Sequence, residues 1–253
     1  PMTRLGMMLL NAVIFCSFAL GAPAGAAAIT GDEILAKVDN AMSASKDRTA
    51  TIKMTLKDKA GVTKVREMKA LQKGKEKRLF QFSAPADIKG ITFLVMSDDE
   101  TYLYTPAFDK IRRISSSAKN EGFMGTDFTY NDLSDIDYPK KYAGKLVKED
   151  GETYYLECTA KPGADTEYAR VEMEVHKASF LPTKVKMYDK AGKHAKTLEC
   201  MKPEKVDGYW TTKYMNMTDV QKNHSTAMEM IQLKHDVGLS DDEFTKRNLK
   251  KLY

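Results

Sequence analysis

The chain has 253 residues, 42% of them hydrophobic and 30% charged, which is typical of a folded globular domain and excludes a disordered, collagen-like or many-helix membrane protein. Its 40 Lys and Arg and 35 Asp and Glu give a net charge of +5. These charges are interspersed and form no basic stripe, so the sequence argues against nucleic-acid binding.

The first residues have the pattern of an export signal. Arg4 precedes an apolar run over residues 5–20, and small residues suited to cleavage follow at 22–28. The run is marginal for a bilayer-spanning helix, which needs roughly 20 residues, and no basic cluster follows it. The sequence therefore predicts a cleaved signal peptide over 1–28, one domain over 29–253 and a periplasmic location.

One helix and many strands are expected after this signal. Thr30-Gly31-Asp32-Glu33 is a capping-box pattern, and apolar residues then recur at helical spacing, which predicts a helix over 31–45. A second capping pattern at 240–243 predicts a short C-terminal helix. Between them, thirteen runs have strand patterns bounded by turn signals, near 49–57, 62–71, 76–83, 90–97, 100–105, 109–114, 141–148, 152–160, 168–176, 182–189, 194–201, 209–218 and 225–235.

These runs predict a mainly β fold. Sequential strands joined by tight turns favour an antiparallel meander, and no crossover helix separates them. So many strands are expected to form a single strongly curved antiparallel sheet or incomplete barrel, closed by the N-terminal helix and irregular segments.

Residues 115–139 interrupt the strand pattern. This segment places Phe123, Met124, Phe128 and Tyr130 among glycines and polar residues. A long loop with large apolar side chains is usually packed against the core or functional. We expect these four residues to form the mouth or lid of a cavity, or alternatively a plug that completes the core.

The sequence contains no catalytic signature. The patterns G-x-S-x-G, H-E-x-x-H, G-x-x-x-x-G-K-[ST] and C-x-x-C are all missing, and the four histidines are spread over different runs. We therefore expect no enzyme activity, no metal site and no cofactor. An exported hydrolase would need a nucleophile and base that the sequence does not display. Cys158 and Cys200 lie in predicted strands, where either a disulfide or two buried thiols would fit.

Methionine is abundant, with 15 in the chain. Several methionines share one face of a predicted strand, including the pairs Met215 with Met217 and Met228 with Met230. Such flexible side chains can pack around ligands of variable shape such as acyl chains, although they also serve as ordinary core fillers. The candidate cavity residues are Met54, Phe93, Met173, Val175, Val185 and Met187.

A basic cluster occupies the run near 109–114. It comprises Lys110, Arg112 and Arg113, which are candidates for contact with lipid headgroups or a partner protein. Solvated strand faces that protect a sheet edge are the alternative.

Three ordered blocks resemble one known family. They are FSAPADIKGITFL at 82–94, YLYTPAFDKIRRI at 102–114 and FMGTDFTYNDL at 123–133. In order and spacing they are similar to the P-A-D-x-K-G, L-Y-x-P-A-x-x-K-x-R-R-I and F-M-G-[ST]-D-F-x-Y-x-D-L blocks of the outer-membrane lipoprotein-sorting proteins, the LolA-like periplasmic proteins.

This resemblance implies that the single curved antiparallel sheet forms a half-open barrel with an N-terminal helix and short helical lid segments over its mouth. The apolar cavity of such a barrel holds acyl chains. The implied function is transfer of a lipid or lipoprotein between membranes without covalent chemistry. A passive carrier needs other machinery to extract its cargo, so an inner-membrane transporter and an outer-membrane acceptor are expected partners. The alternative is a regulatory module that senses lipid or lipoprotein and contacts a membrane-bound partner.

Overall fold

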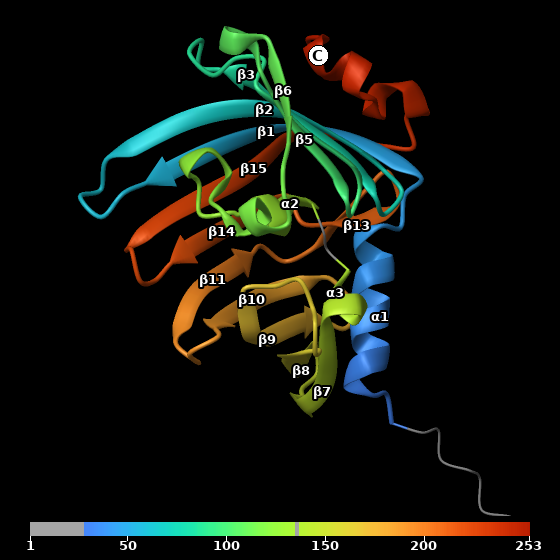
Figure 1. Ribbon diagram of the computed structural model, residues 1–253. Helices are drawn as coiled ribbons and strands as arrows, with labels where there is room; N and C mark the ends of the chain where they lie inside the picture. Colours follow the sequence, from blue (N-terminus) through green and yellow to red (C-terminus); the bar gives the residue numbers. More distant parts are fainter. Residues whose placement is uncertain (1–27, 135–136) are drawn as a thin grey trace, which may run out of the picture.

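The computed structural model describes residues 28–134 and 137–253 (Figure 1). The predicted signal peptide therefore lies outside the described residues, except for its last position. No helix in the described ranges is long and apolar enough to cross a bilayer.

The first half of the fold is one helix followed by six strands. The capping box is present, because the Thr30 side chain accepts from the Glu33 amide while the Glu33 carboxylate accepts from Thr30. The predicted helix is confirmed, although it ends at Met42. The elements are α1 (Gly31–Met42), β1 (Asp47–Lys57), β2 (Thr63–Lys73), β3 (Lys77–Ala84), β4 (Thr92–Ser97), β5 (Glu100–Thr105) and β6 (Lys110–Arg113).

The second half starts with short helices and returns through nine strands. The predicted run over 209–218 contains two strands, β13 and β14, because residues 212–213 interrupt it. The elements are α2 (Tyr130–Ser134), α3 (Tyr138–Lys141), β7 (Tyr142–Glu149), β8 (Thr153–Ala160), β9 (Tyr168–His176), β10 (Pro182–Asp189), β11 (His194–Cys200), β12 (Glu204–Val206), β13 (Tyr209–Thr211), β14 (Tyr214–Asp219) and β15 (His224–His235).

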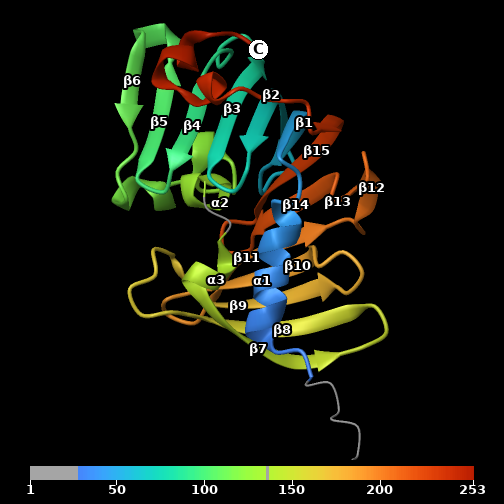
Figure 2. The same ribbon diagram turned by 90° about the vertical axis from the view of Figure 1, so that its right-hand side faces the viewer.

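Thirteen strands form one open antiparallel sheet, which confirms the predicted fold class. Their order is β6-β5-β4-β3-β2-β1-β15-β14-β11-β10-β9-β8-β7, and β12 pairs with β13 in a separate hairpin. The sheet is thus two meanders joined where β1 pairs with β15. Residues 114–141 carry the chain from β6 at one edge to β7 at the other, with α2 and α3 on the way (Figures 1 and 2).

The two faces of the sheet carry separate cores. The concave face packs against α1 through Ile34, Leu35 and Val38, which are fully buried. On the opposite face of β2 to β5, Phe244 and Leu249 cover a smaller apolar cluster. These two residues lie in 3-10 turns, Asp241–Phe244 and Lys246–Lys250, where the sequence predicts a short helix.

A close backbone contact seats α1 against the edge strand β7. A Cβ atom at Gly31 would lie 2.4 Å from the Gly144 carbonyl oxygen, so only glycine allows this approach. The Gly144 amide donates to Asp32 Oδ1 at 2.7 Å. The helix therefore covers part of this edge as well as the concave face.

Candidate functional site

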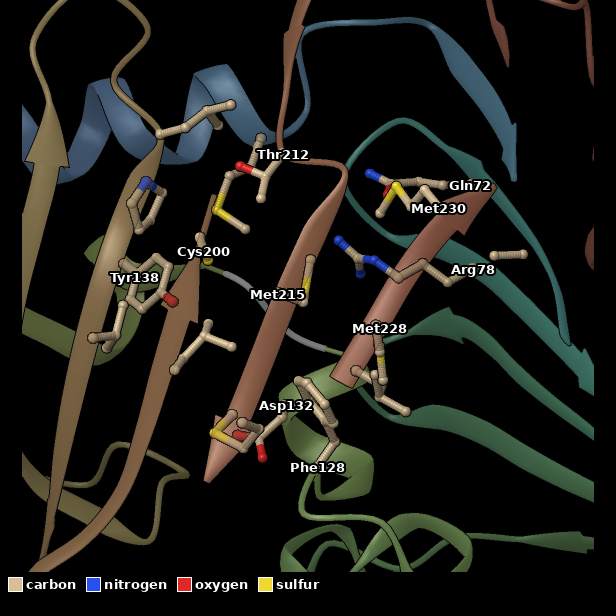
Figure 3. A pocket seen from close by; sticks show the side chains of 18 of the residues that line it. Gln72, Arg78, Phe128, Asp132, Tyr138, Cys200, Thr212, Met215, Met228 and Met230 are labelled. Carbon is tan, nitrogen blue, oxygen red and sulfur yellow. The ribbon is translucent and has the colours of Figure 1, made fainter. Parts of the chain in front are cut away.

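A cavity of about 250 Å³ lies between the concave face of the sheet and the helices α1, α2 and α3. A void needs only about 10–15 Å³ to hold one water molecule, so this cavity has room for a much larger guest than a single water. Figure 3 shows Arg78, Phe128, Met215 and Met228 pointing into the same space.

Most of the cavity wall is apolar and much of it is methionine. The methionine pairs of β14 and β15 that the sequence singles out lie on this wall together. Because methionine side chains adapt to irregular shapes, this wall can pack against flexible hydrocarbon. The apolar lining includes Met42, Phe80, Phe128, Val171, Val185, Met187, Leu198, Met215, Met217, Met228, Met230 and Leu233.

Two of the six predicted cavity residues line this space directly. They are Val185 and Met187 on β10. The other four, Met54, Phe93, Met173 and Val175, are buried in the core.

Register places these buried residues on the cavity side of the sheet. Met173 pairs with Val185, and Met54 pairs with Met228. Phe93 pairs with Phe80, which lines the cavity. Residues directly opposite each other on antiparallel strands share a face, so these side chains lie on the same face of the sheet as the cavity lining. Their contact with a ligand stays a prediction.

The predicted mouth residues divide between the core and the cavity. Phe123 is fully buried and stacks on Phe82 with ring centroids 5.6 Å apart, while Tyr130 packs edge-on against it at 5.4 Å. Phe128 lines the cavity, and Met124 packs at the margin of the core.

Polar contacts tie this segment to the sheet. Asp127 is buried, and its Oδ2 accepts from Thr226 Oγ1 at 2.6 Å and contacts His224 Nδ1 at 2.7 Å. The Arg66 guanidinium donates to the Met124 carbonyl at 2.6 Å. These contacts hold Phe128 in its place at the cavity.

Four charged residues line the mostly apolar cavity, and three of them are basic. No motif in the sequence marks Arg48 or Arg78 as a cavity residue, although each is two residues from an apolar cavity residue of the same strand. A charged residue in phase with the apolar face of a strand is the signal that could have found them. The four are Arg48, Arg78, Asp132 and Lys141.

The single acidic residue of the lining is already engaged. Asp132 Oδ2 accepts from the Thr129 amide at 2.8 Å and lies 3.7 Å from Lys196 Nζ. Lys196 is in turn 3.6 Å from Glu167. The lining groups therefore leave a surplus of positive charge at the cavity.

Both cysteines of the described chain are free thiols. Cys158 is buried on β8, and Cys200 lines the cavity from β11. Burial raises the pKa of each thiol to about 12. Of the two alternatives open from the sequence, free thiols are therefore the observed one.

The predicted basic cluster lies on the exposed edge strand β6. Arg113 donates to the Asp99 carbonyl at 2.6 Å, and Lys110 is exposed. Arg112 lies near the Tyr130 hydroxyl, where burial raises the tyrosine pKa and the guanidinium partly offsets that rise. Through Arg112, this basic edge strand therefore contacts Tyr130, which packs against Phe123.

The described residues also bear on whether the chain could hold a metal ion. Within residues 28–134 and 137–253, no group of three or more His, Cys, Asp or Glu side chains is placed to hold a metal ion. The cavity offers a mostly apolar surface for hydrocarbon together with three basic side chains.

Comparison with known proteins gives relatives of the same architecture. A family model described as "Uncharacterized protein" matches residues 74–251. No curated protein matches the chain.

Three solved structures have a similar fold over 87% of the chain. A DUF1329 family protein from Desulfovibrio piger is 31% identical, with a TM-score of 0.80 and 97% of its own length covered. An outer membrane lipoprotein-sorting protein domain from Vibrio parahaemolyticus is 32% identical, with a TM-score of 0.76 and 98% covered. A LolA superfamily protein from Nitrosomonas europaea shares the fold, with 19% identity, a TM-score of 0.71 and 99% covered.

Proposed function

The chain belongs to the family of LolA-like outer-membrane lipoprotein-sorting proteins, and from that premise we propose that it is a periplasmic carrier. In this proposal it holds the acyl chains of a lipid or lipoprotein in its apolar cavity and moves this cargo between membranes. The observation that carries the proposal is the methionine-rich cavity under α1, α2 and α3.

Burial of hydrocarbon would supply the binding energy. Each buried methylene group contributes about 0.8 kcal/mol, so one long acyl chain offers on the order of 10 kcal/mol relative to water. A membrane offers the chain a similar gain, so the carrier cannot extract cargo by affinity alone. We therefore propose an energised inner-membrane transporter as donor and an outer-membrane acceptor.

Each predicted set of residues has a role in this proposal. Val185 and Met187 contact the acyl chain, with Met54, Phe93, Met173 and Val175 shaping the wall behind them. Phe123, Met124, Phe128 and Tyr130 form the mouth, where Phe128 is the member that touches cargo. Lys110, Arg112 and Arg113 contact headgroups or a partner protein at the β6 edge.

Two neighbouring residues on β15 provide the test. Met230 lines the cavity, whereas the side chain of Ile231 is 48% exposed. We expect Met230→Gln to weaken binding of a fluorescent acyl probe because a polar amide replaces an apolar contact, while Ile231→Gln leaves binding unchanged.

Equal affinities in these two variants, with both folded, would contradict the cavity as binding site. In a separate experiment, native mass spectrometry of protein purified from the periplasm would identify the bound cargo. Tight binding with no transfer between donor and acceptor vesicles would favour the lipid-sensing alternative.

A further inference from the structure

One row of polar side chains crosses the concave face at the end of the cavity. Arg48 on β1 pairs in register with His235 on β15 and with Gln72 on β2, and Gln72 pairs with Arg78 on β3. The next row toward the methionines is apolar and contains Ala50, which pairs with Leu233 and Ala70. The cavity therefore has a polar end and an apolar body.

The Arg48 guanidinium is hydrogen-bonded only to Gln72 within the part of the chain that the structure describes. Its Nε and one Nη donate to the same oxygen, Gln72 Oε1, at 3.1 and 2.7 Å. Among the residues that the structure describes, no carboxylate lies within 4.0 Å of this guanidinium. Burial lowers the pKa of Arg48, as expected for a cation with too little compensating charge.

The other basic groups of the lining are engaged elsewhere. Arg78 donates to the Ser134 carbonyl at 2.6 Å, and Lys141 donates to Asn131 Oδ1 at 3.3 Å. Arg48 differs because its two hydrogen bonds use one edge of the guanidinium, and the second Nη has no hydrogen-bond partner among the residues that the structure describes. Gln72 is fixed in turn, since its amide donates to the Gly74 carbonyl at 3.0 Å.

We propose that Arg48 binds an acidic headgroup, a phosphate or carboxylate, of the amphiphile whose acyl chain fills the methionine-lined cavity. This inference rests on the proposed function and names the chemical class of its cargo. A charged guanidinium in an apolar site is costly unless it is paired, and a planar donor fork suits carboxylate and phosphate oxygens. Gln72 is a positioning residue that orients the fork.

The test compares ligands that share one chain and differ in the headgroup. Dodecanoate, dodecyl phosphate and dodecanol compete for a fluorescent acyl probe at pH 8. We expect the wild-type protein to bind the two anions at least tenfold more tightly than dodecanol. This preference should vanish in Arg48→Gln and be largely kept in Arg48→Lys, while dodecanol binds all three proteins alike.

Arg170 provides a matched control, because it lies outside the cavity and pairs with Glu172. Arg170→Gln should keep the full preference for anions. Equal binding of dodecanoate and dodecanol by the wild type would overturn the inference while leaving the carrier proposal intact. Failure of all three amphiphiles to bind would overturn the carrier proposal itself.

A last arm separates a lipid headgroup from a free anion. Inorganic phosphate alone should fail to displace the probe at concentrations where dodecyl phosphate does so. Displacement by inorganic phosphate as strong as that by dodecyl phosphate would overturn the assignment to a headgroup. The wild-type comparisons need no variant, so they decide the matter even if Arg48→Gln does not fold.

Discussion

The thiol of Cys200 is a reporter placed inside the cavity. It lines the wall, and burial raises its pKa to about 12, so the thiol is almost entirely protonated near neutral pH. The thiolate is the reactive form of cysteine, and at pH values well below the pKa its fraction grows tenfold for each unit by which the pH rises.

We expect iodoacetamide to modify Cys200 slowly at pH 7.5 and about tenfold faster at pH 8.5. A bound acyl chain should slow this reaction further because it covers the wall. Mass spectrometry of a Cys158→Ala variant, in which Cys200 is the sole described cysteine, measures the rate. Rapid labelling at neutral pH, unaffected by ligand, would contradict the placement of Cys200 in the cavity.

The surroundings of His235, at the polar end of the cavity, should make the free energy of unfolding depend on pH. Burial, and then the nearby positive charge of Arg48, lower the pKa of His235 below 6.5. The unfolded chain therefore binds this proton at a higher pH than the folded chain does, and stability falls as pH drops through 6.5.

Replacing this histidine should reduce that pH dependence. Urea midpoints at pH 7.5 and 5.5 should differ less for His235→Gln than for the wild type. Gln keeps hydrogen-bonding capacity near Thr211 and Ser45, the present partners of the ring. An identical pH difference in both proteins would show that His235 titrates as an ordinary histidine.

Single residues also show where sequence patterns stop being informative. The alternation over β1 places Met54 on the concave face, as observed. Arg48 is in phase with the same alternation. Because it is charged, however, the sequence pattern places it before the strand and not on the apolar face. Whether such a residue lines a cavity depends on the strands beside it, which only the pairing of β1 with β15 and β2 determines.

Among the elements, the 123–130 segment combines anchoring with contact to the cavity. Phe123 is stacked in the core, whereas Phe128 faces the cavity. We expect Phe123→Ala to cost about 3–5 kcal/mol of unfolding free energy because it leaves a void. Phe128→Ala should cost less and weaken acyl-probe binding more.

Urea midpoints and lipid-transfer rates measured on both variants separate these roles. A large loss of stability in Phe128→Ala, with normal transfer by the folded fraction, would show that Phe128 only completes the core. The same result in Phe123→Ala is expected, since its ring reaches no part of the cavity wall.

The close contact between α1 and β7 leads to a second prediction, which concerns how α1 is seated against the sheet. A Cβ atom at Gly144 would lie 2.8 Å from the Gly31 carbonyl oxygen and from Leu35 Cδ1. Gly144→Ala should therefore displace α1 and cost about 1–3 kcal/mol. Gly151→Ala, in the open β7–β8 turn with no atom within 4 Å, is the control and should be nearly neutral. Equal urea midpoints for the two variants would contradict this packing.

The sequence predicts whether a segment is a strand better than it predicts which other segments pack against it. Each of the thirteen runs contains a strand because alternation and turn residues are local signals. The second core is less visible in the sequence. Residues 92–95 of β4 are buried on both faces of the sheet, and the consecutive apolar residues 93–95 show no alternation that would assign them to one face. The C-terminal turns that cover it depend on that long-range contact, so their 3-10 geometry has no local signature.

At the scale of the whole molecule, the cavity wall draws on both meanders. Phe80 belongs to the first meander, whereas Met187 and Met228 belong to the second. The strand pattern of the sequence favours a meander of successive neighbours. The chain instead passes from β6 at one edge of the sheet to β7 at the other, and the pairing of β1 with β15 joins the two halves of the open sheet. That pairing joins residues that are between 168 (Lys57 and Ser225) and 187 (Arg48 and His235) positions apart, and no short-range pattern specifies it.

A ligand that contacts both meanders should stabilise the molecule as a unit. An acyl ligand at a hundred times its dissociation constant should raise the unfolding free energy by about 2.7 kcal/mol. Hydrogen exchange should then slow in β3 and in β10 alike. Protection confined to one meander would contradict a binding site that spans the two.

The unclosed sheet has a consequence for how copies of this protein meet. An open antiparallel sheet ends in two strands with unsatisfied backbone groups, which can template strand addition by another molecule. Here β7 meets α1 through the Gly31–Gly144 contact, and β6 has the sequence Lys-Ile-Arg-Arg with every residue exposed. Two molecules approaching edge to edge would therefore meet a helix at one end or repelling charges at the other, and both arrangements oppose growth of the sheet into a fibre.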